Sequence, residues 1–252
     1  MATTTIAAQM LGKLPVRTDV RTLSLARYVD PQLLPQPPAT FAETAKVTAW
    51  PMYANDRVGD CTTAAAGHMI EAWTAAVRGQ AVVIAEQAVL DAFEHVKQVD
   101  PMTGEEGAVE LDVLQYWRKQ GIGAHKIGAY ARVSVHSRRL VQTGAWLFGG
   151  LYIGLALPLT ARTQEVWDWT GSLSGDAQPG SWGGHAVDIV GYGPQGLTFV
   201  TWGSLKQMTW SFWDRYCDEA YCIISPDFLA KGVAPNGLDV GALKADLALV
   251  TA

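Results

Sequence analysis

The sequence has little of what marks membrane, secreted or nucleic-acid-binding proteins. Its 252 residues carry a net charge of -5 without a long basic run, so we expect no nucleic-acid partner. Every long apolar stretch is interrupted by glycine or proline, and the start, from Met1 to Thr5, lacks the basic and apolar segments of a signal peptide. We therefore expect no membrane partner and a cytoplasmic location.

Cysteine is also scarce, with only 3 in the chain. Cys61 is far from Cys217 and Cys222, and an odd count leaves at least one thiol free. Cys217 and Cys222 lie five residues apart in a segment typical of a strand, where an odd separation sends side chains to opposite faces. These features favour buried free thiols in a reducing compartment over a disulfide framework.

The composition that remains, 49% hydrophobic and 17% charged, is typical of a compact globular unit. Residues 1–49 are rich in proline, which predicts an extended arm lying over the domain. The domain itself is expected over residues 50–226. Residues 227–252 are expected to form a tail that packs on it.

Predicted helices precede predicted strands. Apolar residues recur at three- and four-residue steps in the first half of the domain, and short β-rich segments bounded by glycine or proline follow. This order predicts an α+β fold with a helical lobe at about 50–125, a β lobe at about 126–226 and a cleft between them. The helices are expected at 61–78, 85–99 and 109–119, and the strands at 129–135, 151–158, 185–192, 197–202 and 220–225. The apolar segment 146–159 is interpreted as a buried strand.

A cysteine stands where a polar turn gives way to the first helix. The turn runs from Asn55 to Asp60, and Cys61 follows it. Backbone N–H groups and the helix dipole at an N-terminus favour negative charge, so a thiol placed there loses its proton more readily. Asp60, the expected N-cap, opposes this effect with its own charge. Taken alone, the pattern also fits an ordinary cysteine.

A histidine stands at the head of an apolar strand. Residues 183–193 read Gly-Gly-His-Ala-Val-Asp-Ile-Val-Gly-Tyr-Gly, with His185 in third place. A cysteine and a histidine that are distant in sequence but close in space commonly form an activated pair, in which imidazole acts first as base and then as acid. Alone, His185 also fits a structural histidine; with Cys61 it indicates nucleophilic catalysis.

These segments, in this order, resemble the papain-like cysteine proteases over about residues 55–225. The turn before Cys61 is similar to the family's glutamine-glycine loop, with Asn55 where the family keeps its oxyanion-stabilising glutamine. Residues 84–91 and 107–121 are similar to its two following helices, and 185–193 reads almost residue for residue like its catalytic-histidine strand. The resemblance implies a papain-like two-lobe fold, with a helical left lobe and an antiparallel β-sheet or barrel as the right lobe.

The chain departs from the family where an asparagine should orient the histidine. The family has Asn-Ser-Trp-Gly there, and this chain has Val-Thr-Trp-Gly at 200–203. An ungapped count from His185 places Thr201 at the asparagine position, whereas alignment on Trp-Gly places Val200 there. Only Thr201 could accept a hydrogen bond from imidazole. Asp188 is a further candidate, although its place on the strand directs it away.

The resemblance implies thiol-dependent amide hydrolysis of a peptide or protein without a cofactor or metal. Cys61 is the expected nucleophile, His185 the base and Thr201 its orienting residue, while Asn55 and the Cys61 N–H bind the oxyanion. The residues expected to line the substrate groove are Gly59, Asp60, Gly184, Trp182 and Trp202.

Two alternatives remain open. Acyl transfer to an amine uses the same residues as hydrolysis. The missing asparagine also fits a weak or inactive domain that serves as a structural or binding module, self-associating or bound in a virion. The family's long propeptide and paired cysteines are absent, so the resemblance is to divergent bacterial and bacteriophage-encoded members.

Two other groups of residues are weaker candidates for a functional site. His68 lies two turns after Cys61 and could join His185 in a metal site, but no recognisable zinc motif accompanies it. Near the third helix, an acidic group is formed by Asp100, Glu105, Glu106, Glu110 and Asp112. We interpret this group as a solvated face, with selection of basic substrate residues as the alternative.

Overall fold

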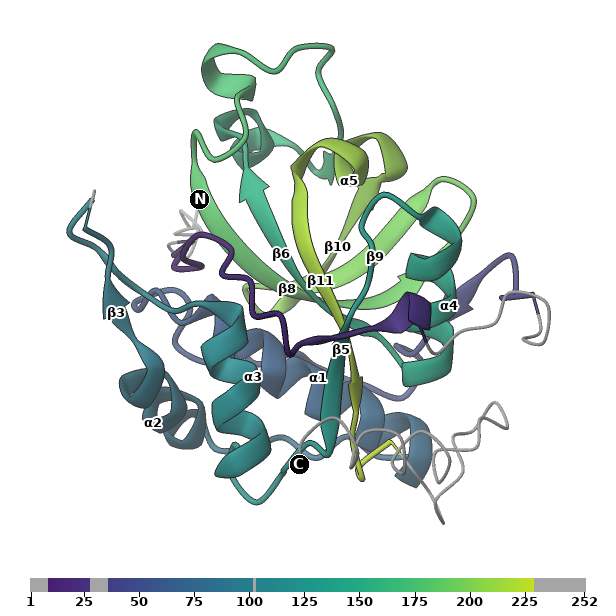
Figure 1. Cartoon of the computed structure of the whole chain (residues 1–252). Helices are drawn as coiled ribbons and strands as arrows, with labels where there is room; N and C mark the ends of the chain where they lie inside the picture. The colour runs from purple at the N-terminus through teal and green to yellow at the C-terminus, as the bar shows by residue number, and fades with distance from the viewer. Residues whose placement is uncertain (1–8, 28–35, 102, 229–252) are drawn as a thin grey trace, which may run out of the picture.

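The structure is a computed structural model that describes residues 9–27, 36–101 and 103–228. Within these residues, five helices and a nine-stranded mixed sheet form an α+β fold of two lobes, with the helices α1 to α3 below the large sheet (Figure 1). No helix in these ranges is long and apolar enough to cross a membrane. The helices are α1 (Cys61–Arg78), α2 (Glu86–Val96), α3 (Glu110–Lys119), α4 (Arg138–Phe148) and α5 (Trp210–Tyr216).

The large sheet has the order β1-β5-β11-β6-β8-β9-β10-β7, and β2 pairs with β8 off this path. Most neighbours are antiparallel, as expected, but the outer pairs β1·β5 and β10·β7 are parallel. The sheet is open in the described residues, so the closed barrel that the resemblance allowed does not form. Its strands are β1 (Leu23–Ser24), β2 (Phe41–Ala42), β5 (Ala129–Arg132), β6 (Leu151–Leu157), β7 (Val166–Trp167), β8 (Gly183–Tyr192), β9 (Gly196–Thr201), β10 (Ser204–Thr209) and β11 (Cys217–Ile224). A separate hairpin pairs β3 (Gln98–Val99) with β4 (Glu106–Gly107).

Helix α1 is the central element of the molecule. Its residues are buried from Cys61 to Ala75, because it packs on β8 on one side and on α2 and α3 on the other. Trp73 stacks on Trp117 of α3 with ring centroids 5.7 Å apart, and its Nε1 donates to the Phe148 carbonyl at 2.9 Å. The helix ends at Gly79, whose φ of 79° is the left-handed conformation that glycine adopts without strain. Both lobes therefore hold α1, and its first residue, in place.

The predicted helices and strands of the helical lobe and the sheet core are present, but two helices were not predicted. Residues 146–159 are not one strand, because α4 continues to Phe148 and β6 starts only at Leu151. Ser137 caps α4 by accepting from the Leu140 N–H at 3.4 Å, and Gly149 ends it at a φ of 69°. Thr209 caps the start of α5, and its hydroxyl accepts from the Phe212 N–H at 3.1 Å.

The chain's N-terminal segment crosses the boundary between the lobes, as the purple trace in Figure 1 shows. We call residues 10–14 the arm strand, because they are extended and bonded to both lobes. Further along, the segment forms β1 and β2. The C-terminal tail lies outside the described residues from 229 onward. All three cysteines are buried and free, as predicted.

Candidate active site

Cys61 is the first residue of α1, and its side chain is buried. The Asp60 carbonyl accepts from the N–H groups of Thr63 and Ala64, at 2.9 and 3.0 Å, which starts the helix at this point. The sulfur accepts from the Ala186 N–H at 3.4 Å. Because Ala186 directly follows His185 on β8, the fold brings the sulfur of Cys61, from the helical lobe, against the backbone of the strand in the β lobe that carries His185.

The turn before Cys61 differs from the prediction in two respects. Asp60 is at the N-cap position, but its side chain makes no cap hydrogen bond, and its Oδ1 instead accepts from the Asn55 Nδ2 at 3.1 Å. Asn55 also donates to the Val58 carbonyl at 3.2 Å, so both of its amide protons are used inside the turn. Asn55 thus holds the turn together in this state and does not point a free donor at an oxyanion.

Burial raises the pKa of Asp60 to about 7, with the Asn55 hydrogen bond acting in the opposite direction. The carboxyl group is therefore largely protonated below neutral pH. The opposing charge expected beside Cys61 is correspondingly reduced there.

His185 is held by Thr201 at the end of β9. Its Nε2 lies 2.7 Å from the Thr201 Oγ1, which fits an Nε2–H donating to the hydroxyl. Nδ1 is left without a hydrogen-bond partner among the described residues, and a nitrogen in this state can act as a base. Val200 packs instead with Ala72 and Val190, so of the two registers considered, the fold puts Thr201 on the imidazole.

Asp188 does not substitute for the missing asparagine. It is fully buried, both carboxylate oxygens lack a partner in the described part of the chain, and its pKa is raised well above the ordinary value by burial and by Glu71. His185 bonds Thr201 instead.

Two tryptophans lie on one side of the histidine, one in contact with its ring and one packed against the first. Trp202 stacks on the His185 ring, with 4.4 Å between centroids and 16° between planes. Trp182 packs behind Trp202 at 5.7 Å. These rings exclude water from one face of the imidazole, and they belong to the segments on either side of β8 and β9.

The groove beside this pair is filled by the arm strand. The Gly12 and Lys13 N–H groups both approach the Gly184 carbonyl, at 3.2 and 3.1 Å. On the other side, Leu14 donates to the Ala108 carbonyl at 3.0 Å and Ala108 donates to the Gly12 carbonyl at 2.8 Å. The groove therefore binds an extended peptide through main-chain hydrogen bonds to both lobes. From the sequence, an extended arm over the domain is expected, but its place in this groove is not.

Glycines make this close approach possible. A Cβ on Gly12 would lie 1.8 Å from the Gly59 carbonyl oxygen, and a Cβ on Gly184 would lie 2.0 Å from the Lys13 carbonyl oxygen. A Cβ on Gly107 would lie 2.3 Å from the Gly12 oxygen. Gly59 and Gly184, predicted to line the substrate groove, thus contact the peptide that occupies it.

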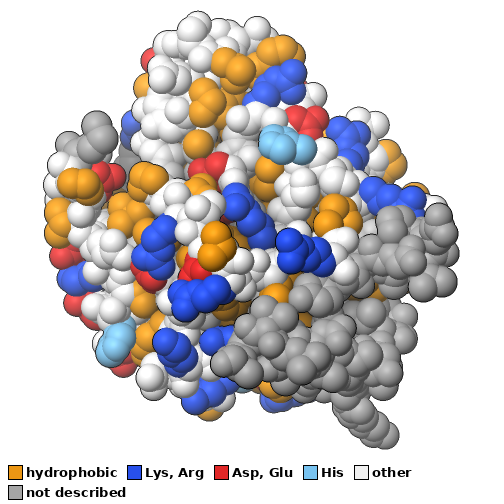
Figure 2. Space-filling view, viewed as in Figure 1, with side chains coloured by type: hydrophobic (Ala, Val, Ile, Leu, Met, Phe, Trp, Pro, Cys, Tyr) orange, Lys and Arg blue, Asp and Glu red, His pale blue; other side chains and the backbone are white. Residues whose placement is uncertain are grey.

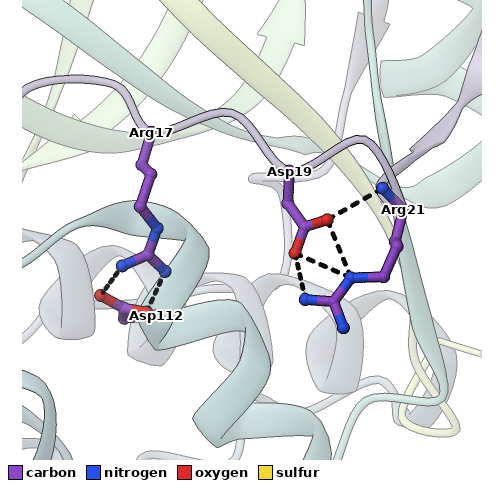
Figure 3. Close-up of polar contacts among 4 residues, drawn as sticks. All are labelled: Arg17, Asp19, Arg21 and Asp112. Atoms are coloured by element: carbon purple, nitrogen blue, oxygen red, sulfur yellow. Dashed lines mark hydrogen bonds and ion pairs between the residues drawn. The ribbon is translucent and has the colours of Figure 1, made fainter.

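Past the groove, the arm is fixed to α3. Figure 3 shows the Arg17 guanidinium facing the Asp112 carboxylate with two hydrogen bonds, of which the Nη1 bond measures 2.8 Å. Two residues on, Asp19 folds the chain locally by accepting from the backbone N–H and the side chain of Arg21, at 2.9 and 3.0 Å. In the space-filling view, Lys and Arg side chains gather near the centre of this face (Figure 2).

Burial keeps the side chains of Cys61 and His185 uncharged. Desolvation raises the pKa of Cys61 to about 12, against a smaller lowering by the Ala186 hydrogen bond. Desolvation also lowers the pKa of His185 to about 3. At neutral pH Cys61 is therefore a thiol and His185 a neutral imidazole, and the Nδ1 of His185 is not hydrogen-bonded to the sulfur.

No group of three His, Cys, Asp or Glu side chains in the described ranges is arranged to hold a metal ion. His68 bonds the Pro51 carbonyl through Nε2 at 2.8 Å and packs against Tyr53. It is a core residue of α1.

No family model and no curated protein sequence matches this chain. Its structure, however, is similar to solved cysteine proteases. Xylellain, a cysteine protease from Xylella fastidiosa, has a TM-score of 0.64 at 14% identity, over 88% of this chain and 99% of that chain. ProCathepsin B S9 from Trypanosoma congolense has a TM-score of 0.58 at 12% identity, over 86% of this chain and 87% of its own. Bromelain from Ananas comosus, solved with the E64 inhibitor, has a TM-score of 0.52 at 14% identity, over 74% and 99%.

The chain therefore has the papain-like fold, as the sequence resemblance implied. At these identities the comparisons concern the fold alone. Any catalytic activity must be inferred from the residues of the site.

Proposed function

We propose that the chain is a thiol-dependent peptidase, or a closely related amide hydrolase or acyl transferase, whose groove is closed by its own arm strand. The observation that carries this proposal is the arm itself. The groove between the lobes binds an extended peptide by main-chain hydrogen bonds at Gly184 and Ala108, directly beside Cys61 and His185. A site that grips a peptide backbone next to a cysteine and a histidine is suited to amide chemistry.

In this mechanism the Cys61 proton passes to Nδ1 of His185, and the sulfur attacks the carbonyl carbon of a bound peptide. The imidazolium then gives the proton to the leaving amine as the C–N bond breaks, and a thioester remains on Cys61. Water, or an amine in acyl transfer, attacks the thioester with His185 as base and frees the sulfur. The first N–H groups of α1 have no partner within the helix and are suited to holding the oxyanion.

Thr201 fixes the imidazole so that Nδ1 is the basic nitrogen. Its hydroxyl orients the imidazole, which is the role of the asparagine in the papain-like family. Asn55 contributes indirectly, by bracing the turn that carries Asp60 and Cys61.

The arm strand inhibits this chemistry in two ways. It occupies the space a substrate backbone needs, and its burial of the pair favours neutral thiol and imidazole over thiolate and imidazolium. Removal of the arm readmits water and restores the charged pair.

The test is covalent labelling of the full chain carrying Gly12→Ala with a peptidyl vinyl-sulfone probe. The substitution is chosen because a Cβ at this position clashes with the Gly59 carbonyl and so displaces the arm. Labelling is expected at Cys61, and it should be lost when Cys61→Ala or His185→Ala is added. A Gly193→Ala chain is the matched control, since the nearest atom to that Cβ is 3.8 Å away.

The filled groove also favours the second candidate, an inactive module of phage or bacterial origin in which the arm is a permanent part of the core. Both Cys61 and His185 are about 1% exposed in this state. If the Gly12→Ala chain is folded, opens the groove to a fluorescent peptide and still leaves Cys61 unlabelled, the module is the better account.

A further inference from the structure

The Lys13 side chain leaves the groove and enters a pocket of acidic side chains. Its Nζ lies 2.9 Å from the Asp218 Oδ2 and 3.1 Å from the Glu219 Oε1. Glu110, the first residue of α3, is the third acid and raises the pKa of Lys13 together with the other two. The Lys13 and Glu219 side chains are 2% and 0% exposed, while Asp218, at 31%, lies at the pocket mouth.

One ammonium group does not satisfy this pocket. Glu110 is fully buried, and neither of its carboxylate oxygens has a hydrogen-bond partner among the described residues. Oδ1 of Asp218 is also without a partner there. Glu219 uses its other oxygen to accept from the Tyr221 hydroxyl at 2.8 Å. The pocket therefore has acceptors left over for a cation with more donors than lysine has.

Gly154 in β6 provides the space for the side chain. A Cβ there would lie 2.0 Å from the Lys13 Cε and 2.8 Å from oxygens of both Asp218 and Glu110. Its backbone is ordinary extended strand, so no turn requires a glycine at this position. Because Gly154 has no side chain, the pocket has room for a long side chain such as that of Lys13.

This pocket corrects the interpretation of the acidic group near α3 as a solvated face. Glu105 and Glu106 are exposed, but Glu110 points inward. Selection of basic residues, the alternative considered from the sequence, becomes the stronger interpretation.

When the arm strand leaves, the pocket loses its cation. Burial raises the pKa of Glu110 and of Glu219, so these carboxyl groups must then either take up protons or remain charged without a partner, which is unfavourable. A peptide that brings its own cation into the pocket removes this penalty. One with an apolar or acidic side chain does not.

We propose that the pocket formed by Glu110, Asp218 and Glu219 around Gly154 is a substrate side-chain site selective for arginine or lysine, which Lys13 of the arm occupies as a stand-in. The proposal rests on the proposed function and names the substrate class of that site, a basic peptide. Arginine fits best, because its planar guanidinium carries five donors that can reach the unused carboxylate oxygens.

Binding is measured separately from catalysis. The full chain carrying Gly12→Ala and Cys61→Ala is titrated, by fluorescence anisotropy, with fluorescein-labelled seven-residue alanine peptides that contain one Arg, one norleucine or one Glu. The Arg peptide is expected to bind at least about tenfold more tightly than the norleucine peptide, since a hydrogen bond to a charged group contributes on this scale. The Glu peptide should bind most weakly.

Replacing the pocket's acidic residues by their amides tests whether they bind the Arg side chain. Glu110→Gln and Asp218→Asn, each added singly, are expected to reduce the Arg-to-norleucine ratio several-fold. Glu94→Gln removes an exposed carboxylate on α2 and should leave the ratio unchanged. Gly154→Ala should lower the affinity for the Arg peptide most, because it fills the pocket.

Equal affinity for the Arg and norleucine peptides, or no binding of either, overturns the proposal and makes the pocket a seat for Lys13 alone. The peptidase proposal has its own readout, cleavage of the Arg peptide by the Gly12→Ala chain with Cys61 intact. Arg-selective binding without cleavage would support the pocket and count against the peptidase.

Discussion

Trp202 stacks on His185, with ring centroids 4.4 Å apart, and its Nε1 donates to the Met10 carbonyl at 3.0 Å. One indole therefore contacts both the candidate base and the strand that closes the groove. Movement of the arm changes the hydrogen bonding of the ring that covers the imidazole.

Gly12→Ala is expected to make Cys61 accessible. The new Cβ clashes with the Gly59 backbone, so the arm strand leaves the groove and solvent reaches the sulfur. Alkylation of Cys61 by iodoacetamide near neutral pH should become at least about tenfold faster than in the unmodified chain, because a thiol that regains hydration and a neighbouring imidazole ionises more readily. Mass spectrometry of the modified peptides gives the rate.

Cys222 serves as the internal standard, since it is buried in β11 and its sulfur bonds the Ala131 carbonyl of β5. Its rate should not change. Equal acceleration at both thiols would indicate general unfolding and contradict the prediction.

Thr201→Val is expected to slow reaction of Cys61 with a vinyl-sulfone probe by about tenfold to a hundredfold in the Gly12→Ala chain, because a hydrogen bond to a charged imidazolium contributes about 1.5–3 kcal/mol. Valine has the same shape but cannot accept from Nε2. Thr201→Ser keeps the hydroxyl and should restore most of the rate. If serine and valine behave alike, Thr201 is only a packing residue.

Lys13→Met is expected to lower the free energy of unfolding by about 3 kcal/mol at pH 8. This is near the lower end of the range for removing one partner of a buried ion pair, because the arm can leave and let water reach the pocket. Burial already raises the pKa of Glu110, and the loss of the ammonium raises it further. A folded-state pKa above the unfolded value contributes stability at low pH that is lost as pH rises. The loss should therefore be smaller at pH 5 than at pH 8 in urea titrations.

Lys97→Met is the matched control for this experiment. Lys97 pairs with Glu94 and Glu106, both exposed, so its removal should change stability little at either pH. A loss at Lys13 that is the same at both pH values would contradict the role assigned to the buried carboxyl groups.

Asp60→Asn is expected to alter how stability depends on pH. The pKa of Asp60 is raised to about 7 by burial, so between about pH 4 and 7 the folded chain binds a proton that the unfolded chain has lost. Stability of the unmodified chain therefore falls as pH rises through this window. The free energy of unfolding of Asp60→Asn, measured relative to that of the unmodified chain, should therefore increase by about 2–3 kcal/mol from pH 5 to pH 8. This follows from about 1.4 kcal/mol for each pKa unit.

Asp56→Asn in the same turn tests whether this effect belongs to the buried carboxyl group. Asp56 is partly exposed and lies beside Arg57, so its substitution should leave the pH dependence as it is. Parallel curves for the Asp60 variant and the unmodified chain would show that the carboxyl group is not desolvated.

Much of the fold was readable from local patterns. The apolar spacing of 61–78 and the strand pattern of 185–192 predict α1 and β8 with errors of a few residues, because both elements are buried on faces that local periodicity reveals. Segment 146–159 was misread. The apolar end of α4 runs into the apolar strand β6 with only two glycines between them, so composition shows no change where the secondary structure changes.

Helix α5 was missed for a related reason. It is seven residues long and rich in aromatic side chains, which favour strands in isolation. Its Thr209 cap and its packing on the sheet decide the helix.

The sequence by itself determined the order of the segments, the helix that starts at Cys61, and the strand that carries His185. These depend on side-chain spacing and on residues that start or stop an element. Tertiary structure decided the partner of the imidazole, since the irregular pairing between β8 and β9 selects Thr201 over Val200. It also decided that Lys13 lies among three acids, because contacts between segments so far apart depend on the path of the whole chain and not on any local pattern.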